Sequence, residues 1–321
     1  MAVNFIKQEP RFKRSEQAES SAGSTGRGYT VEQQLRRAAA LYVYGRMLDE
    51  FREHPEDMQR VVDMEPDVAM RTELRHMVDR VAFAREVLEF EPEPLQIDAL
   101  RSWSRRIIFN CNRQFGKSTV CAIRALHRAW VWPGSLVLLV SRAHAQSGGV
   151  AMKIRDFLPI LGLTSRQVRG DGVNRISIKF PNGSRIVALP GGQKPTRSHS
   201  SAAMVIIDEA AMVADPVHDA VTPTLARTNG ELILASTPMG KRGAFYRAWM
   251  YGGDGWLRVF GPVDELRPGK FSSKFLKEER AQRGEDRFAQ EYLCEFLDMD
   301  SHMFGEDSLQ EVFRQDVESW E

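Results

Sequence analysis

Short, continuously apolar runs recur through the middle of the chain and are separated by stretches with helical spacing. The runs are rich in valine, isoleucine and leucine, and polar residues do not alternate within them. Strands of a parallel sheet have this pattern because helices cover both faces of the sheet and bury every side chain. The pattern therefore predicts strands at 107–109, 136–140, 202–207 and 231–235.

Helices are predicted where apolar residues recur every three or four positions between these strands. They lie at 120–130, 152–161 and 217–227. Strands that alternate with helices indicate an α/β fold with a mostly parallel central sheet flanked by helices. Two further elements are a predicted β-hairpin at 175–189, with Pro181-Asn182-Gly183 at its turn, and an edge strand at 256–263.

The remaining segments are predicted from their composition. The first 28 residues are polar and rich in serine and glycine, as flexible arms are. Helical spacing at 31–51 and 68–88 predicts a helical N-terminal appendage. Pro92 and Pro94 end this pattern and lead into a short helix at 96–103. Two later helices are predicted at 273–282 and 285–297. The expected parts are an arm at 1–28, an appendage at 29–89, a core at 90–262, a helical linker or lid at 263–300 and an acidic tail at 301–321.

The formal net charge of +1 conceals blocks of opposite sign. Residues 49–93 and 278–321 are strongly acidic, whereas residues 142–197 contain ten basic and two acidic side chains. A basic block of this kind fits a polyanion such as nucleic acid, although solvated faces produce similar runs. The three cysteines have no metal-binding or disulfide spacing. No run reaches the roughly 18 apolar residues of a membrane span, so no membrane partner is expected.

The central candidate for chemistry is the stretch Arg113-Gln114-Phe115-Gly116-Lys117-Ser118-Thr119, which lies between the first predicted strand and its helix. In such a loop, backbone N–H groups and the positive end of the helix dipole converge on a phosphate. Lys117 would reach the β- and γ-phosphates of a nucleotide, and Ser118 would hold Mg²⁺. The usual pattern has glycine where this chain has Cys111, and an ordinary helix start is the alternative.

A second candidate is the pair Asp208-Glu209, which ends the strand predicted at 202–207. Asp208 would bind Mg²⁺ through water, and Glu209 would polarise the water that attacks the γ-phosphate. A strand end that meets solvent is the alternative for the pair by itself. Together with Lys117 and Ser118, the pair favours a nucleotide site.

Other side chains are candidates around the same site. Ser236-Thr237 follow the strand at 231–235, where their hydroxyls could sense the γ-phosphate, and a plain turn is the alternative. The Gln96 amide offers a donor and an acceptor that suit adenine. Arg113 and Arg197 could stabilise the charge that spreads over the phosphoryl oxygens in the transition state. Arg142 also follows a strand, but a solvated arginine or a contact to DNA phosphate explains it equally well.

These residues together resemble the large terminase subunit of tailed bacteriophages, the ATPase that drives DNA into the capsid. The resemblance rests on 113–119, Ile206-Ile207-Asp208-Glu209-Ala210-Ala211, Ser236-Thr237-Pro238-Met239-Gly240, Gln96 and 288–296. The motifs cover residues 90–300 in the expected order. A loop that lacks the first glycine and has Arg-Gln before it is similar to a variant in that family.

The resemblance implies a P-loop NTPase fold, ATP as the substrate and Mg²⁺ as the cofactor. It implies adenine contact for Gln96, nucleotide contacts for 113–119 and for Ser236-Thr237, Mg²⁺ ligation by Ser118 and Asp208, and general base catalysis by Glu209. The arginine that completes the site would be Arg113 of the same loop or Arg197 supplied across a ring of subunits, and both alternatives stay open.

The resemblance also implies several partners: double-stranded DNA, a homo-oligomeric ring expected to be a pentamer, a capsid portal and a small terminase subunit. The expected location is the host cytoplasm and, transiently, the viral procapsid. The family's RNase H-like nuclease domain would begin after the linker, and about 20 residues cannot build it, so nuclease activity is not expected of this chain. The alternatives are a helicase or DNA-remodelling ATPase, and a nucleotide-binding assembly module without hydrolysis.

Overall fold

The computed structural model describes residues 43–44, 54–142, 148–163, 176–190, 200–263 and 271–298. The chain separates into two compact units, 1–39 and 40–321, and all described residues lie in the second. The predicted arm at 1–28, most of the helix predicted at 31–51 and the acidic tail lie outside the described residues. In the described part of the chain, no helix is both long enough and apolar enough to cross a lipid bilayer.

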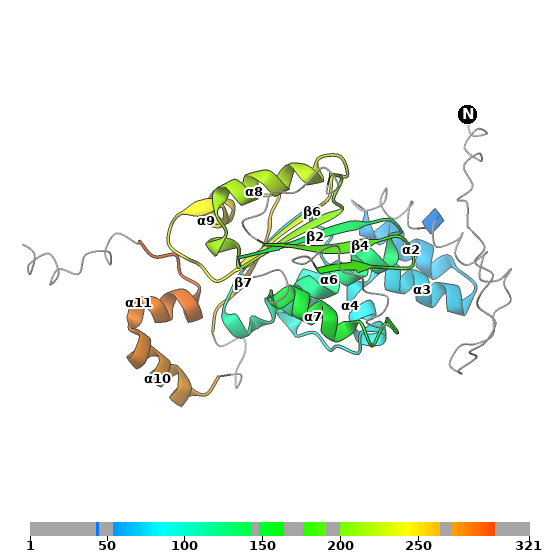
Figure 1. The fold of residues 1–321 in the computed structure, drawn as a ribbon. Coiled ribbons are helices and arrows are strands. Elements are labelled where there is room, and N and C mark those ends of the chain that lie inside the picture. The colour runs from blue at the N-terminus through cyan, green and yellow to red at the C-terminus, as the bar shows by residue number, and fades with distance from the viewer. Residues whose placement is uncertain are drawn as a thin grey trace, which may run out of the picture. The chain divides into compact units, whose positions relative to one another are not determined.

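A seven-stranded sheet forms the centre of the fold (Figure 1). Its order is β3-β4-β2-β5-β6-β1-β7, and every neighbouring pair is parallel except the β3–β4 hairpin. The strands are β1 (Arg106–Cys111), β2 (Leu136–Ser141), β3 (Ile176–Lys179), β4 (Arg185–Pro190), β5 (Met204–Asp208), β6 (Glu231–Ser236) and β7 (Leu257–Gly261). The predicted α/β fold, the hairpin and the edge strand are therefore confirmed.

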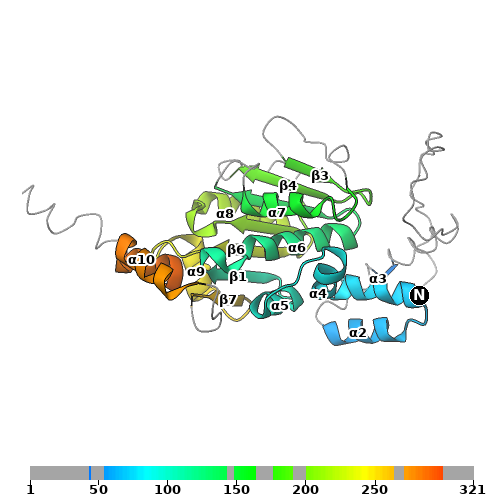
Figure 2. The same cartoon turned by 90° about the horizontal axis from the view of Figure 1, so that it is seen from below.

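Helices cover both faces of this sheet (Figures 1 and 2). One face carries α5 (Pro94–Arg101), α6 (Lys117–Val131) and α7 (Gly149–Phe157), and the other carries α8 (Asp215–Val221) and α9 (Gly243–Tyr251). Alternate strand residues divide between the two cores: Ile107 and Phe109 pack on the α6 side, and Ile108 packs on the α8–α9 side. Burial on both faces explains why the strands read as continuous apolar runs.

The helical stretch predicted at 68–88 is divided into three pieces. These are α3 (Val68–Val78), α4 (Arg80–Ala82) and a π-helical turn, η2 (Phe83–Val87). The division falls at Asp79, whose side chain accepts a hydrogen bond from the Val81 amide at 2.8 Å and so caps a new helix. The sequence analysis did not predict α9 or α2 (Pro55–Met64), although the buried Met58 and Val62 of α2 lie four positions apart.

Packing crosses the domain boundary that the sequence placed after residue 89. Phe83, Ala84 and Leu88 are fully buried in the same core as the sheet-facing side of α6. Further along, side chains of α2 and α3 form a smaller core with Val131 and Trp132 at the end of α6. The described N-terminal helices are therefore packed continuously onto α6, and this boundary is not a break in packing.

A buried network of three charges joins elements that are distant in the sequence. Glu231, the first residue of β6, accepts a hydrogen bond from Arg124 of α6 at 2.7 Å and lies 3.4 Å from Arg80 of α4. The three side chains are at most 2% exposed. The guanidinium groups also donate to carbonyls that end α5, including Ala99 O at 2.7 Å and Ser102 O at 3.0 Å. The network thus supplies the last turn of α5 with donors and joins it to α4, α6 and β6.

His127 of α6 is buried next to this network and predicts a pH dependence of stability. Its Nε2 lies 3.0 Å from the His76 carbonyl oxygen, which it reaches as a neutral donor. Burial, together with nearby Arg80 and Arg124, holds the pKa of His127 well below its ordinary value. The unfolded chain therefore binds one proton more below about pH 6.5, and this group lowers the unfolding free energy by up to about 1.4 kcal/mol per pH unit there, with no effect above that pH.

We expect His127→Gln to be less pH-sensitive than the wild type. Urea unfolding at pH 7.5, 6.0 and 5.0 measures the difference, because His218, the other histidine that is buried among the described residues, is present in both proteins. If the unfolding free energy changed equally with pH in the two proteins, this account would be contradicted.

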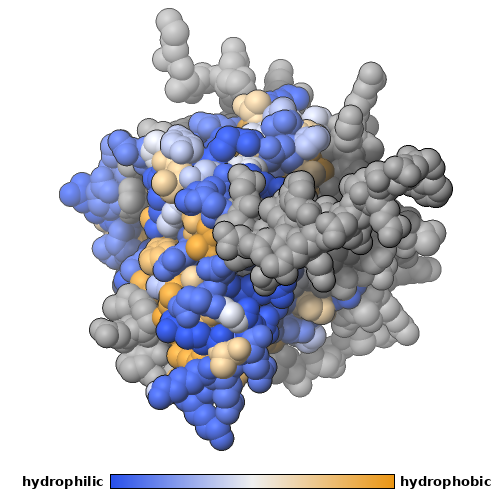
Figure 3. Space-filling view, turned by 90° about the vertical axis from the view of Figure 1, so that its left-hand side faces the viewer, coloured by the Kyte–Doolittle hydropathy of each residue, from blue (hydrophilic) through white to orange (hydrophobic). Residues whose placement is uncertain are grey.

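After β7 the described residues form helices up to Leu293 and then an irregular segment, 294–298. The helices are α10 (Ser273–Arg283), α11 (Glu285–Phe288) and a π-helical turn, η7 (Ala289–Leu293). The side of the molecule that carries α10 exposes mostly hydrophilic residues among those coloured (Figure 3). The second helix predicted in this region extended to residue 297, but Cys294 ends it with a left-handed backbone, φ +61°. The Phe288 and Tyr292 rings stack with their centroids 4.9 Å apart and hold α11 and η7 together.

Candidate active site

The phosphate-loop candidate connects β1 to α6 through a single 3-10 turn, Arg113–Phe115. Gly116 then adopts φ +88°, which glycine reaches without steric cost. A Cβ at this position would also lie 2.7 Å from the Gln96 amide nitrogen. Cys111 is the last residue of β1 and has no positive φ, so the glycine of the usual pattern is not required there.

Lys117 is the first residue of α6, and its ammonium group folds back onto the loop. Its Nζ donates to the carbonyl oxygens of Cys111, at 2.5 Å, and Asn112, at 2.7 Å. Burial lowers the pKa of Lys117, and the neighbouring Cys111, Cys294 and Asp208 oppose that shift. Backbone carbonyls therefore hold the Lys117 Nζ, and phosphate oxygens can replace these acceptors with stronger hydrogen bonds.

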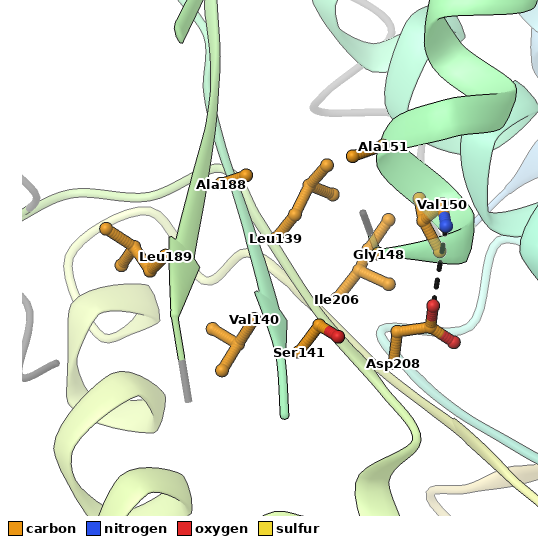
Figure 4. A pocket seen from close by; sticks show the side chains of 10 residues that line it. All are labelled: Leu139, Val140, Ser141, Gly148, Val150, Ala151, Ala188, Leu189, Ile206 and Asp208. Atoms are coloured by element: carbon orange, nitrogen blue, oxygen red, sulfur yellow. Dashed lines mark hydrogen bonds between the residues drawn. The ribbon is translucent and has the colours of Figure 1, made fainter. Parts of the chain in front are cut away.

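Asp208, the last residue of β5, lies beside Ser118 on the α7 side of the sheet. Both border Gly149, because a Cβ there would lie 2.8 Å from Ser118 Oγ and 3.3 Å from Asp208 Oδ2. The Val150 amide, at the start of α7, donates to the Asp208 carboxylate at 3.4 Å (Figure 4). Burial raises the pKa of Asp208, and the Val150 amide and Lys117 act in the opposite direction. A hydroxyl, a carboxylate and an ammonium group are thus neighbours.

The start of α7 belongs to the site, although the sequence analysis did not include it. The helix was predicted at 152–161, and it begins at Gly149. Adjacent glycines, Gly148-Gly149, were the available signal, because a side chain at Gly149 would collide with Ser118. The Val150 amide and the positive end of α7 stabilise the Asp208 anion.

Glu209 differs from Asp208 in both backbone and exposure. It has a left-handed conformation, φ +54° and ψ +40°, and its side chain is exposed, whereas Asp208 is 7% exposed. The Glu209 amide donates to Asp208 Oδ1 at 3.2 Å. A left-handed residue other than glycine costs about 1–2 kcal/mol, and such strain concentrates at functional sites. The turn places two adjacent carboxylates in different environments at one sheet edge.

β6 lies between β5 and β1. Its last residue therefore lies between Asp208, which ends β5, and the phosphate loop, which follows β1. The register pairs Asp208 with Ala235 and Asn110 with Ser236. Ser236 is 3% exposed, and Thr237 is half-buried. Because β1, β5 and β6 are parallel, their carboxyl ends meet at one edge, where ligands of open α/β sheets bind.

Gln96 lies against the phosphate loop, and both ends of its amide are bonded to the chain. Its Nε2 donates to the Phe115 carbonyl at 2.7 Å, and its Oε1 accepts from the Glu93 amide at 3.1 Å. The side chain is 3% exposed. These contacts fix the loop to the start of α5, and adenine contact by Gln96 stays a prediction.

The candidate arginines have different surroundings. The Arg113 guanidinium binds the carboxylate of Glu291 in η7 through hydrogen bonds of 2.8 and 3.1 Å. Arg142, which follows β2, has its Nη1 3.6 Å from the Met212 sulfur. Arg197 lies outside the described residues. Glu291 was not foreseen as a neighbour of the loop, because 178 positions separate it from Arg113.

Comparisons with known proteins agree with this architecture. A family model described as the N-terminal part of the terminase large subunit, T4likevirus-type, matches residues 108–311. The large terminase subunits of Thermus virus P23-45 and Thermus phage G20c are each 25% identical over an alignment of 255 positions, and the match covers 68% of this chain and 52% of theirs. The chain thus spans about half the length of these curated relatives.

Two solved structures of similar fold are large terminases. The large terminase ATPase domain of Thermus phage P74-26 superposes with a TM-score of 0.55 at 20% identity, covering 66% of this chain and 97% of that domain. The large terminase of bacteriophage HK97 gives a TM-score of 0.55 at 18% identity, covering 68% of this chain and 55% of its own. Since the family match extends over more than half of its residues, this chain belongs to the terminase large subunit family.

Proposed function

We propose that this chain is the ATP-hydrolysing motor of viral DNA packaging, which moves double-stranded DNA into a capsid. The observation that carries the proposal is the meeting of Lys117, Ser118 and Asp208 at one edge of the sheet. Membership of the terminase large subunit family supports it, as does the likeness to a domain named as a large terminase ATPase.

The donors at this edge fit a nucleotide accompanied by Mg²⁺. Mg²⁺ takes one or two protein oxygens and keeps water and phosphate ligands, and Ser118 and Asp208 supply a hydroxyl and a carboxylate that both border Gly149. When bound, Mg²⁺ would neutralise charge on the phosphate oxygens. Lys117 would exchange its carbonyl partners for phosphate oxygens, and the first amides of α6 would donate to the same phosphates.

Other residues of the chain would position water and stabilise charge. Glu209, exposed beside the buried Asp208, would accept the proton of the attacking water. Arg113 or Arg197 would stabilise the transition state, and both alternatives stay open. Ser236-Thr237, at the end of the strand between the two halves of the site, would sense the γ-phosphate.

DNA contacts are proposed for the basic block at 142–197. Among its described residues, four exposed cations lie after β2, on α7 and on β3: Arg142, Lys153, Arg155 and Lys179. Contacts from such side chains to phosphates would not depend on base sequence, as a motor that moves any genome requires. A homo-oligomeric ring, a capsid portal and a small terminase subunit are the partners proposed with this function.

The test is the rate of ATP hydrolysis per subunit, measured against protein concentration with and without linear double-stranded DNA. We expect Mg²⁺-dependent hydrolysis that rises severalfold with concentration, as neighbouring subunits complete each other's sites. DNA molecules of unrelated sequence should stimulate hydrolysis equally.

Two outcomes would overturn the proposal. ATP binding without turnover at every concentration would indicate an assembly module. Displacement of a DNA strand driven by hydrolysis would indicate a helicase.

A further inference from the structure

The phosphate loop begins at Asn112, and every polar group of this residue forms a hydrogen bond within the chain. The side chain is fully buried. The backbone amide and Nδ2 both donate to the Gly261 carbonyl oxygen at 2.9 Å. Oδ1 accepts from the Gln114 amide at 2.9 Å, and the Asn112 carbonyl accepts from Lys117 Nζ at 2.7 Å. Asn112 therefore joins the end of β7, the 3-10 turn and the lysine of the site.

Gly261, the last residue of β7, also contacts the other end of the turn. A Cβ at this position would lie 2.6 Å from Phe115 Cε2 and 2.9 Å from Cys111 Sγ, which is too close for any side chain. The Phe115 carbonyl, in turn, accepts from Gln96 Nε2 at 2.7 Å. The turn is thus held at its start by Asn112 and at its end by Phe115, and both of these residues contact the same glycine.

These contacts explain how the loop keeps its shape without the first glycine of the usual pattern. Cys111 pairs with Gly261 in the β1–β7 register, so strand pairing continues up to the residue before the loop. Asn112 then starts the turn, and its side-chain oxygen acts as the N-cap acceptor. The hydrogen bonds of an asparagine and the close approach of a strand glycine therefore fix the turn.

We propose that Asn112 is a positioning residue for the phosphate chain of the nucleotide, because it holds the loop in its binding shape against Gly261. This inference rests on the proposed ATPase function. The first amides of α6 and Lys117 converge on the phosphates only while the turn keeps its shape. A loop without its contacts to Gly261 spends part of its time in other shapes, and the apparent Kd rises as the binding-competent fraction falls.

Asn182, in the turn of the β3–β4 hairpin, provides a matched control because it makes the same types of contact at the opposite end of α6. Its Oδ1 accepts from the Ser184 amide, two residues further on, at 3.1 Å. Its Nδ2 donates to the carbonyl oxygens of Ala129 and Trp130 at 2.9 and 3.1 Å. Replacing either asparagine with alanine removes hydrogen bonds of the same kind, but only Asn112 contacts the phosphate loop.

The experiment measures the Kd values of AMP-PNP and ADP, each with Mg²⁺ and without DNA, for the whole chain and its variants. We expect Asn112→Ala to raise both values by the same factor, about 5- to 30-fold, because both nucleotides carry the phosphates that the loop binds. Asn112→Ser keeps an acceptor for the Gln114 amide and loses only the Nδ2 donor, so it should raise them less, about 2- to 5-fold. Asn182→Ala should leave both values nearly unchanged. Urea unfolding of the same preparations checks that each variant is folded.

Gly261→Ala tests the contact from the side of β7 in the same assay. The added methyl group would press on the Phe115 ring and on Cys111 and displace the turn. We therefore expect the Kd values of AMP-PNP and ADP to rise in this variant as well. Unchanged values would contradict the role of Gly261 in holding the loop.

Kd values for Asn112→Ala close to those of the wild type would overturn the proposal. So would an equal increase with Asn182→Ala, because lost stability alone would then weaken binding, or an increase for AMP-PNP without one for ADP. If the wild type binds neither nucleotide, the proposed function and this inference both fail. If the wild type binds both nucleotides and does not hydrolyse ATP, the proposed function fails, and the Kd values still decide this inference.

Discussion

Replacing Glu209 with glutamine is expected to slow ATP hydrolysis by about 10²–10⁴-fold and to leave the Kd for the nucleotide nearly unchanged. The amide keeps the size of the side chain but cannot accept a proton from water. The Glu209 side chain is exposed, and its contact with Asp208 is made by the backbone amide, which the substitution keeps. The substitution should therefore not disturb Lys117 or Ser118. Steady-state hydrolysis and AMP-PNP binding, measured on the same preparation, separate the two effects.

Asp219→Asn is the matched control, because Asp219 is an exposed carboxylate on α8, away from the sheet edge. It should hydrolyse ATP at the wild-type rate. If Glu209→Gln hydrolysed ATP at the wild-type rate, Glu209 would not be the general base. A loss of nucleotide binding in that variant would instead assign it a structural role.

Replacing Glu231 with glutamine is expected to lower the free energy of unfolding by about 3–5 kcal/mol. The substitution removes the charged carboxylate that both buried guanidinium groups, those of Arg80 and Arg124, contact. Burial lowers the pKa of Arg124 to about 10, so it still carries its charge at neutral pH. Urea unfolding measures the loss, and α6, which begins with Lys117, should be affected as part of the same core.

The control for this experiment is Asp156→Asn, which removes an exposed pair between Lys153 and Asp156 at 3.3 Å. This substitution should lower the free energy of unfolding by less than about 1 kcal/mol. A loss as small as this in Glu231→Gln would mean that the carbonyls at the end of α5 suffice for both guanidinium groups.

The sheet could be predicted from the sequence because burial on both faces requires apolar residues at nearly every position of a strand. Ile107, Ile108 and Phe109 face two different cores, and both cores require apolar side chains. The same reasoning could not locate the capped break at Asp79, since a local hydrogen bond there decides the outcome. The sequence analysis missed α2, although Pro55 at its start and the buried Met58 and Val62, four positions apart, are helical signals.

The site was predictable in part for a different reason. Lys117, Ser118 and Asp208 lie next to strand ends, and parallel strands bring their carboxyl ends together whatever their separation in sequence. No such rule predicts that Glu291 and the Val150 amide lie at the site. They reach the site through the packing of η7 and α7, which depends on side chains far away along the chain.

The anchoring of residues 294–298 at the carboxyl edge of the sheet also sets the shortest fragment that keeps this edge intact. The Lys241 amide, in the loop after β6, donates to the Leu297 carbonyl at 3.1 Å, and Asn110 donates to Cys294. A polypeptide truncated soon after β7 would strip both donors of their acceptors and open the buried Asn110 to water. A fragment that keeps this sheet edge intact therefore has to extend to about residue 298.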